Sequence, residues 1–537
     1  MEFIIDFESK WVIDYNFDFL DNNGHPIGTI KIPVFFKHHN DYYCSRSVLK
    51  NSLAYVKSEL MTIFQSKKDI CEYYGIHFDE IKDIYFTLGT ELEFWVRTPA
   101  DVISVDELLV TQQLKESYWK RTKGQVRKAM EESLIMLQLY GLEPEMGHKE
   151  VGGVKGKISH DGSLHDVMEQ LEIDWTYNVP LQTADNELLA RIIIKEVFRK
   201  NGLEVTFDAK PVENVAGSGE HMHVGFGLEL NNGKKINLFA THHKNHYLAS
   251  FGYGALMGLL KNWYAINPLV THSIDGLNRL KPGFESPICV VSSLGVSPEN
   301  SSRNRSVLIG LVRSKNPLGV RFEVRAPNPH TNTYLSASGF YLAMLDGIKY
   351  SLGKSEDELL KELNKKIGEN ADYLDKDKEY RTEKNIFDDF TFEERVKYFG
   401  KQHNSVWEIL EELKTNLSFY EDSPISEKIL NSYYLSVLNK WLIEIQEKII
   451  PASISRIREI KRYKDEENSY DEEIWQKISA EKQLIAKNSK TLSSLIQKIE
   501  DAINSEDYEL VSRLFLSLQN RMSNLEIIYK KYKKNLL

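Results

Sequence analysis

The sequence predicts an α+β protein in three parts. Up to about residue 350, short strand-like segments mix with helical patterns, and the order is not that of a regular βαβ repeat. Beyond it the chain is rich in Glu, Lys, Leu and Ile and poor in Gly, which is typical of amphipathic helices. We therefore expect a β-rich part at 1–80, a mixed part at 81–350 and an all-helical part at 351–537.

The first part opens with three strand-like segments, Phe3–Phe7, Trp11–Phe19 and Thr29–Phe36, with the turn signal Asp21–Gly24 among them. A helix is predicted over 48–64, because apolar residues recur there on one face at Leu49, Leu53, Val56 and Leu60.

In the mixed part, apolar spacing predicts a helix from Glu187 to about Lys200, with Asn201 and Gly202 as its stop signal.

In the third part, apolar residues recur at helical spacing over Leu484–Ile503 and Leu510–Leu525. These helices must bury their apolar faces on each other, on the core or on a neighbouring subunit.

Composition excludes several classes of protein. With 68 Lys and Arg against 78 Asp and Glu, the net charge of −10 argues against a nucleic-acid-coating protein. No apolar run approaches the ~20 residues that span a bilayer, and the N-terminus lacks the features of a secretory signal. The three cysteines are far apart, which fits a reduced cytoplasm and not a disulfide or zinc framework. We expect a cytoplasmic protein without nucleic-acid or membrane partners.

The chemistry is concentrated in strand-like segments that carry ionisable residues two positions apart, where side chains share one face of a strand. The three segments contribute Glu91 and Glu93, then His221 and His223, then Arg321, Glu323 and Arg325. Any one of them alone is typical of a strand with a solvated polar face. If all three share a sheet or barrel, they create a charged cavity.

Adjacent carboxylates repel, so their pKa values rise unless positive charge joins them. Two divalent cations would supply it, and Mg²⁺ and Mn²⁺ favour carboxylate oxygen and tolerate imidazole. Arginines beside such a site indicate a negatively charged substrate, because the guanidinium group matches carboxylate and phosphate.

An ordered set of motifs extends this pattern across about residues 85–350. It comprises Gly89–Phe94, Gly147–Gly152, Glu169–Asp174, Ala184–Asp185, Phe207–Pro211, Ala216–His223, Asn278–Pro287, Arg303–Ser306 and Arg321–Arg325. In order and spacing these motifs resemble the glutamine synthetase family. The helical tail, through Ile449–Ser453, is more loosely similar to the long type III members. The resemblance implies an antiparallel curved sheet (a half-barrel) flanked by helices, and a reduced β-grasp is one candidate for the N-terminal part.

The resemblance also implies two metal sites for Mg²⁺ or Mn²⁺, one formed by Glu93, Glu150 and Glu172, and the other by Glu91, His221 and Glu323. Five carboxylates would then face two divalent ions, with His221 neutral. Glu150 fits the flanking residues better than Asp166 does. His148 and Lys149 are interpreted as structural, since the family's residues there are not ligands.

The implied reaction has two steps: ATP phosphorylates the γ-carboxylate of glutamate, and ammonia then displaces phosphate. By resemblance, Arg279 and Arg325 hold the glutamate carboxylates, and Arg305 serves the γ-carboxylate and the transferred phosphoryl group. His223 and Arg321 face the nucleotide. Gly217 lets the backbone approach the amino acid closely. Glu285 would take the proton from ammonium and close the site against water.

The sequence departs from the family's pattern at several positions. An insertion, Val154 to Met168, separates Glu150 from Glu172. Gly310 replaces an arginine that faces the nucleotide, and Arg313 is the candidate substitute. The first 80 residues contain no D-G-S-S segment. In the family its aspartate comes from a neighbouring subunit and helps to bind ammonium, so its absence bears on both the amine substrate and the ring interface.

Three hypotheses follow. The first is an ATP-dependent ligase that joins ammonia to L-glutamate, assembled as a homo-oligomeric ring such as a dodecamer, as the resemblance implies. The second keeps the glutamyl phosphate chemistry but uses a larger amine, a polyamine or alkylamine. The third is a non-catalytic relative that assembles or regulates. The retained ligand set opposes the third, because buried carboxylates are costly unless paired.

Overall fold

The computed structural model describes residues 1–39, 41–99, 122, 124–158, 164–212, 215–281, 286–300, 302–463, 468–488 and 493–535. It divides into two compact units. The first comprises Met1–Thr271, Asn278–Gln402 and Asn416–Ile429, and the second His272–Leu277, His403–Thr415 and Leu430–Leu537.

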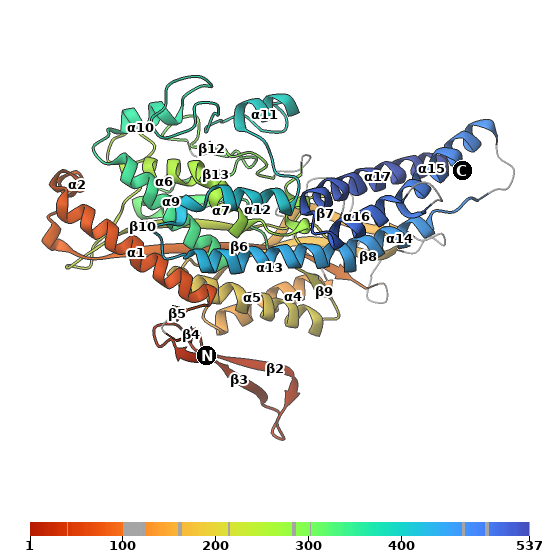
Figure 1. Cartoon of the computed structure of the whole chain (residues 1–537). Coiled ribbons are helices and arrows are strands. Elements are labelled where there is room, and N and C mark those ends of the chain that lie inside the picture. Colours follow the sequence, from red (N-terminus) through yellow and green to blue (C-terminus); the bar gives the residue numbers. More distant parts are fainter. Residues whose placement is uncertain are drawn as a thin grey trace. The chain divides into compact units, whose positions relative to one another are not determined.

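A nine-stranded sheet forms the centre of the first unit (Figure 1). Its main path runs β12-β13-β14-β10-β6-β8-β7, with β11 paired to β10 and β9 to β6. Every pairing is antiparallel except that of β12 with β13. The strands are β6 (Ile81–Thr98), β7 (Pro144–Ile158), β8 (Leu164–Trp175), β9 (Glu204–Thr206), β10 (Glu220–Leu230), β11 (Lys235–Asn237), β12 (Ser292–Ser293), β13 (Ile309–Val312) and β14 (Arg321–Val324).

The helices of the first unit are α1 (Ser45–Ser66), α2 (Lys68–Tyr73), α4 (Gly124–Leu139), α5 (Pro180–Lys200), α6 (Ser250–Lys261), α7 (Trp263–Val270), α9 (Thr333–Ser351), α10 (Glu356–Leu363) and α11 (Phe392–Phe399), with short helices η1 (Phe78–Glu80), η2 (Pro317–Gly319) and η3 (Leu417–Tyr420). The predicted stop of α5 at Asn201 and Gly202 is confirmed. The helix begins at Pro180, earlier than predicted, because proline at the first helical position has no amide hydrogen to lose.

Alternation along β6 separates a packed face from a polar face. Phe86 packs edge-on against Tyr341 of α9, and Phe94 packs edge-on against Phe198 of α5. Apolar residues of α4 and α5 join Leu92 and Phe94 in one buried cluster. Since side chains two apart share a face, these helices cover one face of the sheet and leave the other to Glu91 and Glu93.

The N-terminal strands form a three-stranded sheet, β1-β4-β5, and a separate hairpin, β2-β3. They are β1 (Glu2–Ile5), β2 (Val12–Leu20), β3 (Pro26–Lys31), β4 (Val34–His38) and β5 (Asp41–Tyr42). The single strand predicted over Thr29–Phe36 is wrong: it is two strands that meet at Ile32 and Pro33, where proline cannot donate to a ladder.

The second unit is helical, as predicted for the tail. Its helices are α12 (Val406–Thr415), α14 (Ile450–Glu459), α15 (Ser469–Ala486), α16 (Leu495–Asn504) and α17 (Tyr508–Asn535), with the π-helical η4 (Glu444–Ile449). Two helices, α8 (Ile274–Arg279) and α13 (Glu427–Ile443), contain residues of both units. Fully buried side chains such as Trp441, Ile478, Phe515 and Leu518 give this unit its own core.

The α+β fold class with a helical C-terminal region is therefore confirmed, while the three-part division of the chain stays a prediction. Within the described ranges, no helix has the length and apolar character needed to cross a membrane.

A buried ionic network ties the N-terminal segment to the helices that support the sheet. Arg46 Nη2 lies 2.6 Å from Asp6 Oδ2 and 2.9 Å from Asp185 Oδ2 of α5. Ser9 accepts from the same nitrogen, and Tyr334 of α9 donates to Asp185.

We predict that Arg46→Ala lowers the free energy of unfolding by about 3–5 kcal/mol, because it leaves two carboxylates without their buried partner. Scanning calorimetry measures the effect. Arg97→Ala, at the exposed pair with Glu204 on the same unit, is the control and should cost no more than about 1 kcal/mol. Equal losses in the free energy of unfolding from both variants would contradict the conclusion that Arg46 forms a buried ionic network.

Candidate active site

Five neighbouring strands bring the predicted ionisable residues to one face of the sheet. In register, His221 on β10 lies opposite Glu91 on β6, and His223 lies opposite Glu323 on β14. Toward the other edge, Glu93 lies opposite Glu172 on β8, and Glu172 lies opposite His148 on β7. Positions far apart in the sequence thus become neighbours through strand pairing alone.

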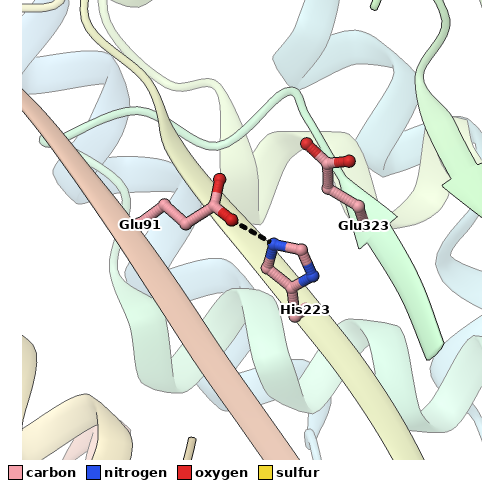
Figure 2. Close-up of side chains that lie close together, drawn as sticks. All are labelled: Glu91, His223 and Glu323. Atoms are coloured by element: carbon pink, nitrogen blue, oxygen red, sulfur yellow. Dashed lines mark hydrogen bonds and ion pairs between the residues drawn. The ribbon is translucent and has the colours of Figure 1, made fainter. Parts of the chain in front are cut away.

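One cluster consists of Glu91, His223 and Glu323, whose ligand atoms all lie within 4.8 Å of one another. In Figure 2 the three side chains converge from β6, β10 and β14. His223 Nε2 is 2.7 Å from Glu91 Oε1. His221 is also present, with Nδ1 3.3 Å from Glu91 Oε2 and 3.5 Å from Glu323 Oε1.

The hydrogen bonds of the two histidines fix the position of the proton on each ring. Arg321 Nε donates to His223 Nδ1 at 3.0 Å, and arginine can only donate. His223 Nδ1 is therefore an acceptor, and the ring proton lies on Nε2, which donates to Glu91. His221 Nδ1 faces Glu91 and Glu323, and Arg279 Nη2 lies 3.4 Å from its Nε2. Because arginine can only donate, Nε2 of His221 accepts and its ring proton lies on Nδ1, which donates to Glu91. Each histidine thus accepts from an arginine and donates to Glu91.

A second cluster consists of His148, Glu150 and Glu172, again with ligand atoms within 4.8 Å of one another. His148 Nδ1 is 3.8 Å from Glu150 Oε2, and its Nε2 is 3.8 Å from Glu172 Oε1. Glu93 lies between the clusters, and its Oε2 accepts hydrogen bonds from Gln170 Nε2 at 3.0 Å and from the amide of Gly219 at 2.8 Å.

The pKa values of the glutamates show the effect of burying these acids close together. Burial, with Glu93, Glu91 and Glu150 close by, holds the pKa of Glu172 well above its usual range, and burial also raises that of Glu93. Although burial opposes it, His223 and His221 hold the pKa of Glu91 well below its usual range. Arg325 likewise outweighs burial and lowers the pKa of Glu323. The pKa values of Glu91 and Glu323 are therefore lowered where histidines and arginine lie beside them, and those of Glu172 and Glu93 are raised where acids are buried together.

These residues fit divalent cations. Glu150 Oε2 is buried, and no hydrogen bond to it is found among the described residues. Carboxylate oxygens and imidazole nitrogens in such groups are the donors that Mg²⁺ and Mn²⁺ take. The charge of either ion would offset the repulsion that raises the pKa of Glu172.

Arginines border the site, as the sequence suggested. Arg279 is 5% exposed, donates to the carbonyl oxygens of Ala326 and Arg325, and has its pKa lowered to about 10 by burial. Arg325 donates to Glu323 and to the carbonyl oxygen of Arg305. Arg305 itself is the more exposed arginine, 3.9 Å from Glu150.

The remaining residues predicted for the site are Arg313, Gly217 and Glu285. Arg313 follows β13 at the point where Val312 pairs with Arg321, and its buried Nη1 has no hydrogen-bond partner in the described structure. Gly217 is enclosed by protein: a Cβ there would lie 2.3 Å from the carbonyl oxygen of Ala209 and 2.8 Å from Arg279 Cγ. Glu285 lies outside the described residues.

Two residues escaped the sequence analysis as members of the site. His148 precedes Glu150 by two positions, and Asp174 follows Glu172 by two, so the alternation rule places each with its glutamate. Asp174 lies opposite Glu91 in register, has a buried Oδ1 without a hydrogen bond within the described ranges, and has its pKa raised to about 6 by burial and by Glu91. The alternation signal was present for both residues but was overridden by the family motif.

We predict a pH-dependent effect of Glu172→Gln on stability without metal. The folded chain keeps a Glu172 proton that the unfolded chain releases, so ionisation costs stability as the pH rises above the usual glutamate range. Glutamine cannot ionise and avoids this loss. In EDTA, the melting temperature of the variant should therefore rise relative to wild type, by several degrees, between about pH 5 and pH 8. A difference that shrinks with pH would contradict the raised pKa.

We also predict that Gly217→Ala costs about 1–3 kcal/mol, because the new methyl group displaces Arg279 or the Ala209 backbone. Gly310→Ala is the matched control, since its Cβ would meet only Glu323 Oε2 at 3.7 Å. Melting temperatures compare the two. If both substitutions changed the melting temperature equally, the segment around Gly217 would have moved to make room for the methyl group, which would contradict the prediction.

The comparisons with known proteins agree with this geometry. Residues 43–365 match the family described as glutamine synthetase, catalytic domain. A glutamine synthetase of Clostridium saccharobutylicum is 34% identical over 36% of this chain and 40% of its own length, and one of Pyrococcus woesei is 30% identical over 64% and 66%. A protein named 3-hydroxylaminophenol mutase, from Cupriavidus pinatubonensis, is 29% identical over 48% and 51%.

The chain spans about half, or less, of the length of the first curated relatives that it matches. The family match nevertheless covers more than half of the 537 residues and contains both clusters. On that match, over the same strands that carry the acidic face, the chain belongs to the glutamine synthetase family.

Proposed function

We propose that the protein ligates ammonia to L-glutamate at the expense of ATP, giving L-glutamine, ADP and phosphate through a γ-glutamyl phosphate intermediate. The observation that carries the proposal is the convergence of five glutamates and two histidines on one sheet face, bordered by four arginines, in a chain of this family. The arrangement offers what phosphoryl transfer to a carboxylate requires: cation sites and guanidinium groups around negatively charged reactants.

In the first step, an oxygen of the glutamate γ-carboxylate attacks the γ-phosphorus of ATP, and ADP leaves. Two cations, Mg²⁺ or Mn²⁺, would be held by Glu93, Glu150 and Glu172 and by Glu91, His221 and Glu323. When bound, they offset the charge that moves between phosphate oxygens. His223 and Arg321 would face the nucleotide with Arg313 beside them, and His223 keeps Glu91 in position through its 2.7 Å hydrogen bond.

In the second step, the nitrogen of ammonia attacks the acyl carbon, the bond from carbon to the phosphate oxygen breaks, and phosphate leaves. Arg279 and Arg325 would bind the carboxylates of glutamate, and Arg305 would stabilise the transferred phosphoryl group. The 5% exposure of Arg279 puts its charge where water screens it little. Glu285 is proposed, from the family motif alone, as the group that takes the ammonium proton.

A larger amine is the second candidate substrate. The absent D-G-S-S segment favours it, since the family's ammonium-binding aspartate lies there. The relative named as a mutase shows that similar chains carry names other than glutamine synthetase.

A homo-oligomer in the cytoplasm is proposed as well. The N-terminal segment exposes large apolar side chains, including Phe3 at 65% and Phe7 at 78%, which a neighbouring subunit would cover. This exposure supports association but does not specify the number of subunits in a ring.

The test is ADP release and amide formation with ATP, glutamate and Mg²⁺ or Mn²⁺, comparing ammonia with polyamines and alkylamines. We predict the fastest turnover with ammonia. Turnover only with organic amines would show that the substrate is a larger amine and not ammonia. If metal-loaded protein releases no ADP with any amine, both proposed reactions are refuted.

We further predict that Glu323→Ala lowers kcat at least ~100-fold, the scale of losing one charge-stabilising group at a reaction centre. Calorimetry should show one metal site fewer than in wild type. Glu229→Ala is the control, because Glu229 lies on β10 but pairs with Lys82 away from the clusters. An unaltered metal count in Glu323→Ala would contradict the assignment.

A further inference from the structure

We propose that His243, His246, Glu356 and Asp357 form a Zn²⁺ site in the first compact unit, separate from the acidic face of the sheet. The two histidines lie in the segment between β11 and α6, and the two acids begin α10. None of the four belongs to either cluster of the candidate active site. The proposal is independent of the ligase reaction.

The two histidines lie at the ends of one tight turn. The amide of His246 donates to the carbonyl oxygen of His243 at 3.2 Å, the hydrogen bond that closes a β-turn over residues 243–246. Such a turn brings its first and fourth residues together, and the centres of the two imidazole rings are 6.1 Å apart. The spacing of two intervening residues therefore presents two ring nitrogens to the same surroundings.

One carboxylate oxygen faces both rings. Glu356 Oε2 is 2.8 Å from His243 Nδ1 and 3.8 Å from His246 Nε2. His246 Nε2 is also 3.6 Å from Asp357 Oδ1. A tetrahedral zinc ion with bonds of ~2.0–2.2 Å separates its ligand atoms by ~3.4 Å, and the three observed distances lie on both sides of that value. Small side-chain rotations would therefore bring four ligand atoms around one ion.

Glu356 is held in place from its other side. It is 6% exposed, and its Oε1 accepts hydrogen bonds from the hydroxyl groups of Tyr73 and Thr241. Burial and the nearby Glu356 raise the pKa of Tyr73, so this hydroxyl keeps its proton and donates. The two hydroxyl donors on Oε1 leave Oε2 to the histidines. Carboxylates that bind metals are regularly fixed by outer hydrogen bonds of this kind.

His246 is directed at the two acids. Its side chain is 13% exposed, and its buried Nδ1 makes no hydrogen bond within the described ranges, so the polar contacts of the ring are those of Nε2 with Glu356 and Asp357. Asp357 is 89% exposed and is free to turn towards an ion. With both imidazoles neutral, the four ligands carry a charge of −2, which one Zn²⁺ balances. Two imidazoles and two carboxylates are ligands that zinc accepts in four-coordinate sites.

The ion would join segments that are remote in sequence. Tyr73 ends α2, the histidines follow β11, and Glu356 begins α10. Because the unfolded chain does not assemble these ligands, zinc binding would stabilise the folded state. Zn²⁺ should therefore raise the melting temperature of the wild-type chain more than that of His243→Gln.

The experiment counts Zn²⁺ by calorimetry on the metal-free full chain. His243→Gln should remove one zinc site, or weaken it by more than the ~10–100-fold that loss of an outer partner costs a metal site. The side chain of His243 is 62% exposed, so the variant is expected to fold. His25→Gln, at the exposed pair with Asp21, is the matched control and should bind as many ions as wild type.

A double variant separates this site from the acidic face. His243→Gln combined with Glu323→Ala should bind one zinc ion fewer than Glu323→Ala alone, since distant sites act additively. This count does not require ligase activity, so failure of the proposed reaction would leave it unchanged.

Direct ligation is tested by His243→Cys, because zinc and cobalt accept a thiolate where they accept imidazole. This variant should retain the zinc site and, loaded with Co²⁺, show a near-ultraviolet thiolate-to-cobalt absorption that the wild type lacks. Equal zinc counts in wild type and His243→Gln, or no such absorption in His243→Cys, would overturn the proposal.

Discussion

Mutual repulsion among buried carboxylates is the constraint on which the rest of the site depends. Glu93, Glu150 and Glu172 lie on adjacent strands with at most 9% of each residue exposed. Burial and proximity raise the pKa values of Glu172 and Glu93, so positive charge close to them would favour their ionised forms. Hydrogen bonds from His221 and His223 stabilise ionised Glu91, and Arg325 stabilises ionised Glu323. On the β7–β8 side we propose that cations do so. We propose that the acidic face binds cations, and that the cations in turn would attract phosphate and carboxylate groups.

The sheet makes this arrangement rigid. Antiparallel pairing fixes which residues oppose one another, and a one-residue slip would turn every acid to the helix-covered face. The packed side of β6, where Phe94 meets Phe198, resists such a slip because a large apolar cluster would be exposed. Apolar packing on one face of the sheet thus also keeps the charged side chains on the other face in position.

The alternation rule accounts for how much of the site could be predicted from the sequence. Pairing of ionisable residues two apart identified Glu91 and Glu93, His221 and His223, and Arg321, Glu323 and Arg325. The structure places them on the adjacent strands β6, β10 and β14, with Arg325 directly after β14. The helical tail and the end of α5 were likewise visible in apolar spacing and stop signals.

What could not be predicted depends on pairing between strands. The insertion at 154–168 appeared to separate Glu150 from Glu172, yet its described ends extend β7 and β8 as one antiparallel pair, with Val154 opposite Glu169 and Lys157 opposite His165. The contribution of His148 depends on this register, which no local pattern shows. Gly217 was expected to let the backbone approach the substrate, and this stays a prediction; the structure adds that a Cβ there would meet Ala209 and Arg279. That contact forms between segments remote in sequence.

The most direct measurement of the central claim is anomalous X-ray diffraction at the manganese edge from crystals of the full chain soaked in Mn²⁺. The account predicts two peaks on the sheet face, one among Glu91, His221 and Glu323 and one beside Glu150 and Glu172. Well-diffracting crystals with no peak on that face, or with manganese bound only elsewhere, would contradict it.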